Sequence, residues 1–119
     1  MDEKINGTIE ISEEVIASIA TTAALEVEGV YKVNQKMSPS VKSLSAQLKH
    51  VVKGVNIISS EDGMDITLQI VVKHGCNIPE VSQKVQKNIF DSLSGMTGLS
   101  IKRINVIVSN VAEEKNKTK

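Results

Sequence analysis

The sequence has few of the residues that binding and catalytic surfaces commonly use. Only Tyr31 and Phe90 among its 119 residues are aromatic, so a surface that stacks nucleic-acid bases on rings is not expected and the core must be aliphatic. The 14 basic and 14 acidic residues give a net charge of zero, which removes the general electrostatic argument for binding nucleic acid or a membrane surface. The single cysteine, Cys76, cannot form an internal disulfide.

The chain also lacks an apolar leader and a run of about 18 apolar residues, the length that would cross a membrane. It is therefore expected to be cytoplasmic. A chain of 119 residues buries roughly 65% of its unfolded surface on folding, which is enough for one core. We expect a flexible N-terminal tail over 1–6, a single α+β domain over 7–111 and a polar C-terminal tail over 112–119.

The strongest pattern is a strand followed by the helix that covers it. Apolar and polar side chains alternate after Gly63, so a pleated strand would point its apolar side chains to one face. Pro79 and Glu80 suit the first turn of a helix, and the apolar residues that follow recur every four positions. The two apolar sets are Met64, Ile66, Leu68, Ile70 and Val72 on the strand, and Val81, Val85, Ile89 and Leu93 on the helix.

The remaining elements are predicted from shorter patterns. Ser12 is suited to cap a helix that stops at Gly29. A one-residue slip in the apolar pattern of the last strand predicts a bulge near Lys102-Arg103, and this strand should lie parallel to the central one because a helix connects them. The expected ranges are a strand at 7–11, a helix at 13–27, an extended segment at 30–33, a loop at 34–39, a helix or a mobile loop at 39–53, a strand at 54–60, a helix from 79 that ends at 94–95, and a strand at 99–111.

These elements predict an α+β fold, a two-layer sandwich in which helices pack on one face of a small mixed sheet. The sheet should have about four strands, in the order β-α-(α)-β-β-α-β. Its stability would come from aliphatic burial. A sheet this small leaves exposed strand edges, which are candidate contact surfaces.

The residues offer few candidates for chemistry. His74 and Cys76 stand two apart and would supply half of a zinc site, but only His50 remains to join them besides carboxylates, so no metal site is expected. The same pair lacks a third group to orient a Cys-His nucleophile. No catalytic residue and no cofactor are therefore predicted, and the protein is not expected to be an enzyme.

The segment Gly95-Met96-Thr97-Gly98 matches the GxxG loop with which KH domains clamp a nucleic-acid backbone. A nucleic-acid-binding regulator would use this turn together with Lys102-Arg103. A glycine pair at the end of a helix is the more usual explanation, and the net charge and scarce aromatics count against nucleic acid as a partner.

Two features are candidates for partner binding. Between Lys32 and Gly54 the chain has five lysines and no acidic residue. If 39–53 is a helix, three of these lysines share a flank that would dock an acidic partner or anionic headgroups, although a solvated face is the commoner explanation. Phe90 lies about 120° from the centre of its apolar stripe, and it is either a second-layer core residue or an exposed interface anchor. The lysines of the flank are Lys42, Lys49 and Lys53.

Several short segments, taken in order, form a combination that is more specific than any one of them. They are Gly7-x-Ile9-x-Ile11-Ser12-x-Glu14-Val15-Ile16-x-x-Ile19-Ala20, Glu28-Gly29-Val30, Asp62-Gly63, Ile70-Val71-Val72-Lys73-x-Gly75-x-x-Ile78-Pro79-Glu80-Val81, Met96-Thr97-Gly98-Leu99 and Val106-x-Val108. This combination resembles the alkaline shock protein family over roughly residues 7–111. The chain departs from the family pattern most in its serine-rich middle and its short tails.

The resemblance implies a small cytoplasmic bacterial protein, typical of Gram-positive lineages, that serves envelope stress and cell-wall homeostasis. It carries over no catalytic residues. Some members look like accessory proteins held at the membrane by a separate anchoring partner, and others resemble regulators associated with fatty-acid synthesis. We therefore expect a non-enzymatic interaction or scaffold module that self-associates and docks on a membrane-anchored or envelope-associated protein at the inner face of the membrane. The alternatives are a regulator associated with fatty-acid synthesis and a nucleic-acid-binding regulator that uses the turn at Gly95–Gly98.

Overall fold

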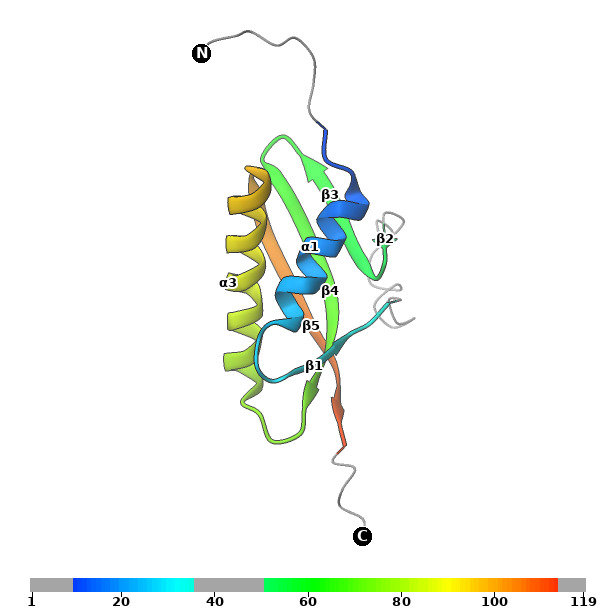
Figure 1. Cartoon of the computed structure of the whole chain (residues 1–119), viewed down its shortest axis with the longest axis vertical. Coiled ribbons are helices and arrows are strands. Elements are labelled where there is room, and N and C mark those ends of the chain that lie inside the picture. The colour runs from blue at the N-terminus through cyan, green and yellow to red at the C-terminus, as the bar shows by residue number, and fades with distance from the viewer. Residues whose placement is uncertain (1–9, 36–50, 114–119) are drawn as a thin grey trace, which may run out of the picture.

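Strand β4 (Gly63–Lys73) lies at the centre of the sheet. Along one edge it pairs with β5 (Ile101–Ala112), and along the other with β3 (Val55–Ser60) and β1 (Val30–Val33). The two-residue strand β2 (Val51–Val52) extends the sheet beyond β3. This computed structural model describes residues 10–35 and 51–113, and Figure 1 shows the arrangement of their elements.

Strands β3 and β1 share one edge of β4 end to end. β3 pairs with residues 63–68 of β4 and β1 with residues 70–72, both antiparallel. Between them, the backbone N–H of Asn34 donates to the carbonyl of Gln69 over 3.0 Å. The predicted β3–β4 hairpin and the parallel pairing of β4 with β5 are both confirmed. The predicted mixed α+β sheet is thus confirmed. Of its five described strands, β1 comes from the segment that was expected only to be extended, and the short β2 was not predicted.

Two helices of the described chain, α1 (Glu13–Leu25) and α3 (Ile78–Thr97), cover one face of this sheet. In Figure 1, α3 runs beside β5 and α1 crosses toward β3 and β1. This is the predicted two-layer arrangement, and it leaves the opposite sheet face without a covering helix among the described residues.

The core lies between the sheet and the helices. The apolar side chains predicted for β4 and α3 are buried there, apart from Met64, which is half-buried. Each fully buried aliphatic side chain stabilises the fold by about 1.5–3 kcal/mol. On α1 the buried face consists largely of alanine, whose small side chain allows close approach to the layer below. The buried residues of α1 are Ile16, Ala17, Ala20, Ala23 and Ala24.

The helix ends follow from their capping residues, and two predicted ends were wrong. Ser12 caps α1, its hydroxyl accepting from the backbone N–H of Val15 over 3.2 Å, but α1 ends at Leu25 rather than near residue 27. Asn77 caps α3 in the same manner. α3 continues through residues 94–95 to Thr97, because the left-handed residue that stops it is Gly98, with a φ of 72°.

The predicted bulge in the last strand is confirmed. The partner of β4 moves from Ile101 to Arg103 in a single step, so Lys102 is the extra residue. A second shift, which was not predicted, passes over Ser109. β5 also includes Ala112, which was expected in the polar tail.

Some predictions fall on or near residues that the structure does not describe. The strand expected at 7–11 lies largely outside the described residues, and Glu10 and Ile11 themselves form no strand. The segment 39–53, left open as a helix or a loop, also lies largely outside the described residues. Within it, Val51 and Val52 form strand β2 and Lys53 lies in the turn that follows, so the helical alternative is wrong for these three residues.

Candidate interaction site

A groove of about 450 Å³ runs between the outer flank of α3 and the start of β5. It lies at the free edge of the sheet, since β5 pairs with β4 alone among the described strands. Helix side chains form one wall and the first residues of β5 form the other. The lining residues are Gln83, Gln86, Lys87, Phe90, Asp91, Ile101, Lys102, Arg103 and Ile104.

Phe90 is the main apolar side chain that the helix presents to this groove. It directly follows Ile89, which is fully buried, and successive helical residues are rotated by about 100°. This rotation carries Phe90 off the buried stripe, and 45% of its surface is exposed. Of the two alternatives for Phe90, the exposed position is therefore the correct one.

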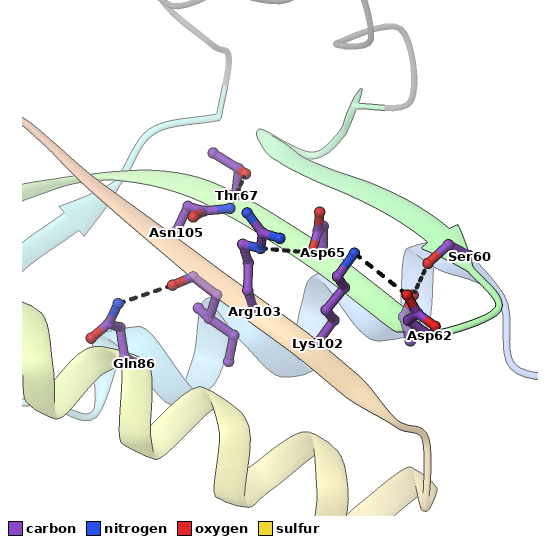
Figure 2. A network of polar contacts seen from close by, with 10 residues as sticks. Ser60, Asp62, Asp65, Thr67, Gln86, Lys102, Arg103 and Asn105 are labelled. Atoms are coloured by element: carbon purple, nitrogen blue, oxygen red, sulfur yellow. Dashed lines mark hydrogen bonds and ion pairs between the residues drawn. The ribbon is translucent and has the colours of Figure 1, made fainter.

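The edge of β5 presents backbone groups to the same groove. The side-chain amide of Gln86 donates to the carbonyl of Ile104 over 3.0 Å, and Figure 2 shows this bond reaching from α3 to β5. The N–H of Met64 donates to the carbonyl of Ser100 over 3.0 Å, so Met64, and two residues later Ile66, direct their backbone groups toward β5. In a parallel ladder such a residue bonds to the two neighbours of its register partner. Ile104, the partner of Ile66, therefore directs its own backbone groups away from β4.

The charged groups around the groove are paired with one another. Lys87 lies 2.9 Å from Asp91 on α3. At the start of β5, Arg103 Nε lies 3.3 Å from Asp65 Oδ1, and Lys102 Nζ lies 4.0 Å from Asp62 Oδ2. Figure 2 shows the β5 cations reaching toward these acids. Exposed pairs of this kind contribute about 0–1 kcal/mol each, so they order the surface more than they stabilise it.

The segment Gly95–Gly98 is not an open turn. Gly95, Met96 and Thr97 form the last turn of α3, and Gly98 is its C-cap. The N–H of Gly98 bonds to the carbonyl of Ser94 over 3.1 Å. The prediction that the helix ends at 94–95 was wrong, and the loop that the GxxG alternative requires is not formed.

The predicted lysine flank is not assembled by the described residues. Lys53 is exposed in the turn between β2 and β3, with a φ of 54°, a left-handed value that does not occur within a right-handed helix. Lys42 and Lys49 lie outside the described residues. The assignment of Lys53 to a helical flank was therefore wrong, while the binding role of the three lysines stays a prediction.

The turn that holds His74 and Cys76 joins β4 to α3. Cys76 has a free thiol and is half-buried against the core. Within residues 10–35 and 51–113, no group of three His, Cys, Asp or Glu side chains could hold a metal ion. His50 lies outside those ranges.

A second hollow, which sequence reasoning missed, lies on the sheet face opposite the helices. It has a volume of about 570 Å³ and is bordered by Tyr31, Asn34, Val71 and Ser109, among others. Asn34 Nδ2 donates to Ser109 Oγ over 2.8 Å and to Gln69 Oε1 over 3.0 Å. The one signal in the sequence was a glutamine in the middle of an apolar strand, and Gln69 is indeed fully buried.

The part of the chain that the structure describes holds no helix long and apolar enough to cross a membrane.

Comparison with known proteins gives a family and several relatives. A family model described as the alkaline shock protein 23 family, with a cell envelope-related function, matches residues 1–113. The chain is 38% identical to the uncharacterized protein YqhY of Bacillus subtilis over 105 residues, which cover 88% of this chain and 77% of that protein. It is 32% identical to an uncharacterized protein of Streptococcus pyogenes over 116 residues, covering 93% of this chain and 95% of that protein.

A more distant relative has a descriptive name. The stress response regulator gls24 homolog of Streptococcus pyogenes is 23% identical over 107 residues, which cover 90% of this chain and 60% of that protein. No solved structure matches the chain.

Proposed function

The chain belongs to the alkaline shock protein family, whose function is related to the cell envelope, and from this premise we propose that it is a non-enzymatic interaction module of a bacterial envelope stress response. It works in the cytoplasm through protein–protein contacts, by associating with itself and by docking on a membrane-anchored or envelope-associated protein. The name of the gls24 relatives, stress response regulator, supports the link to stress. The relatives come from Bacillus and Streptococcus, which fits a Gram-positive setting.

The exposure of Phe90 is the main support for the proposed protein–protein contact. An aromatic side chain that is 45% exposed can remove a large apolar area from water when a partner covers it, and aromatic residues are enriched among the residues that dominate binding energy. Phe90 lines the groove beside the outer edge of β5, which pairs with no other strand among the described residues. The exposed apolar surface of Phe90 therefore lies next to the outward backbone groups of β5.

The polar groups of the groove are suited to binding a partner rather than to catalysis. Lys87 and Asp91 neutralise each other across one helical turn, and Gln86 is bonded to the β5 backbone. A partner that covers the groove would meet paired charges, so it would not have to bury an isolated one.

The proposal is tested by complementation. The gene for this chain is deleted from its host, and a gene that encodes the Phe90→Asp variant is introduced in its place. Phe90→Asp should fail to restore survival under envelope stress and should reduce the share of the chain that sediments with membranes. Leu25→Asp is the matched control, because Leu25 is also an exposed apolar residue, at 49%, on a different helix. If both variants restore survival and recruitment as the natural chain does, the contact role of Phe90 is lost.

A further inference from the structure

We propose that two copies of this chain pair through their β5 strands, antiparallel about a two-fold axis at Ile107, so that two sheets become one continuous sheet. The proposal rests on the self-association that is part of the proposed function, and it specifies the surface and the register. It follows from the direction of the β5 backbone groups, the faces of its side chains and the charges at its two ends.

The outer edge of β5 has backbone groups ready for pairing. The strand is 12 residues long and, in the described chain, pairs with β4 only. The carbonyl of Ile104 points outward, toward Gln86. Because successive residues of a strand direct their backbone groups to opposite edges, Val106 and Val108 point outward as well. Long unpaired edges of this kind are templates for a further strand.

With its two bulges taken into account, β5 can pair antiparallel with a second copy so that side chains on the same face of the sheet lie opposite one another. Before the second bulge, the residues on the helix side are those paired with Ile66, Leu68 and Ile70, and after it the residue paired with Val72. On β5 these helix-side residues are Ile104, Val106, Val108 and Val111, and the residues on the opposite face are Arg103, Asn105, Ile107 and Asn110.

Two β5 strands paired about Ile107 therefore place residues of the same sheet face opposite each other. Val106 lies opposite the partner's Val108, and Ile104 lies opposite the partner's Val111, all four on the helix side. Asn105 lies opposite the partner's Asn110 on the other face, while Ser109 is passed over as the bulged residue. The outward backbone groups of each helix-side pair then face one another and form the ladder.

Apolar surface is covered in this register. Val106 and Val108 are half-buried in the single chain, and Val111 is 37% exposed. The partner's Val111 would enter the groove next to Ile104 and beneath Phe90. Its N–H would replace the Gln86 amide as the donor to the carbonyl of Ile104, so that carbonyl keeps a hydrogen bond.

The charges at the two ends of β5 favour a second copy as the occupant. Lys102 and Arg103 lie at the start of the strand, and Glu113 directly follows its end. Antiparallel pairing brings the cations of one copy beside the acid of the other, twice per dimer. A parallel arrangement would place like charges together, which is destabilising.

The register is tested with a single cysteine. Ile107→Cys, made together with Cys76→Ser, places two thiols opposite each other in a non-hydrogen-bonded pair, where Cα atoms are about 4.5 Å apart, within the range of a disulfide. Mild oxidation should convert most of this variant to a covalent dimer. Asn105→Cys in the same background is the control, since its two copies would be separated by about four residues, or about 13 Å along the strand, and should stay uncoupled.

The pairing is tested independently with a charge on the axis. Ile107→Lys should weaken self-association by about tenfold or more in sedimentation measurements, because it sets like charges face to face. Ile58→Lys is the matched control, being half-buried on the same sheet face but on β3, two strands away from the β5 edge, and it should leave self-association unchanged. Circular dichroism confirms that both variants fold.

The outcomes separate this proposal from the proposed function. A natural chain that stays monomeric across the micromolar range, or an Ile107→Cys variant that crosslinks no better than Asn105→Cys, would overturn the β5 pairing. If Ile107→Lys is monomeric and still restores survival under envelope stress, the pairing stands, and it is the role of self-association in the proposed function that fails.

Discussion

Asn34 Nδ2 lies 3.0 Å from Oε1 of Gln69, whose side chain is fully buried in the middle of β4. Asn34→Ala removes this donor from a buried acceptor. We expect a loss of about 1–3 kcal/mol in the free energy of unfolding, measured by urea denaturation. Ser109→Ala removes the other, exposed acceptor of Asn34 together with the longer bond of 3.3 Å from the Ser109 hydroxyl to the carbonyl of Ile70, and it should cost less than Asn34→Ala. Equal losses would show that the buried bond is not the important one.

Gly29 should tolerate no side chain. A Cβ atom there would come within 2.6 Å of Val81 Cγ2, and the φ of 105° is unfavourable for any L-residue. Gly75 has a similar φ of 89° with nothing within 4 Å of its Cβ position. Gly29→Ala should therefore destabilise the fold by about 1–3 kcal/mol more than Gly75→Ala, the cost of overpacking. Thermal unfolding of the two variants measures the difference, and equal melting temperatures would contradict the clash.

The cap of α3 should depend on an acceptor oxygen at Asn77. Its Oδ1 accepts from the N–H of Glu80 over 3.0 Å. Asn77→Ala should lower the free energy of unfolding by about 1 kcal/mol, whereas Asn77→Asp keeps the acceptor and adds a charge favoured at a helix N-terminus. Chemical denaturation measures the free energy of unfolding of both variants. If Asn77→Asp is as unstable as Asn77→Ala, loss of the cap is not the cause of the destabilisation.

The lysines of the middle segment should matter for recruitment and not for folding. Replacing Lys42, Lys49 and Lys53 together by Glu reverses charge in a stretch that has no acidic residue. Binding to anionic vesicles or to the membrane fraction should fall, since each basic residue near an anionic surface contributes about 1 kcal/mol. The same change at Lys115, Lys117 and Lys119 alters net charge equally and serves as the control. Unchanged recruitment of the first variant would remove these lysines as contacts.

The central strand and its covering helix could be predicted because each depends on a pattern within one short segment. Alternation specifies which side chains of β4 face the helices, and a spacing of four specifies which side chains of α3 face the sheet. Gln69 and Val71, on the other face of β4, are buried as well, which alternation does not predict. Even the bulge at Lys102 left a trace, since the extra residue shifts the apolar pattern by one. The bulge at Ser109 left the same kind of trace, a step from Val108 to Val111, but with one apolar residue after it the step was too short to be recognised as a slip.

The groove could not be predicted, because it depends on how distant segments meet. The apolar stripe of α3 predicts that Phe90 is rotated away from Ile89. It does not predict whether another layer of the fold covers Phe90. That depends on the position of α3 beside β5, which places Phe90 at the edge of the sheet. The end of α3 was misjudged for a local reason, because two glycines compete as the stop signal and the sequence does not say which one adopts a left-handed conformation.

The sharing of one β4 edge by β3 and β1 has a consequence for how the molecule comes apart. Among the described strands, β1, β3 and β5 each pair with β4 and not with one another, and β2 is attached only through β3. Withdrawing β4 would leave no ladder except the short β2–β3 pair. The sheet should therefore be lost as one cooperative unit, and the amide hydrogens in the middle of β4 should be the slowest in the chain to exchange with deuterium.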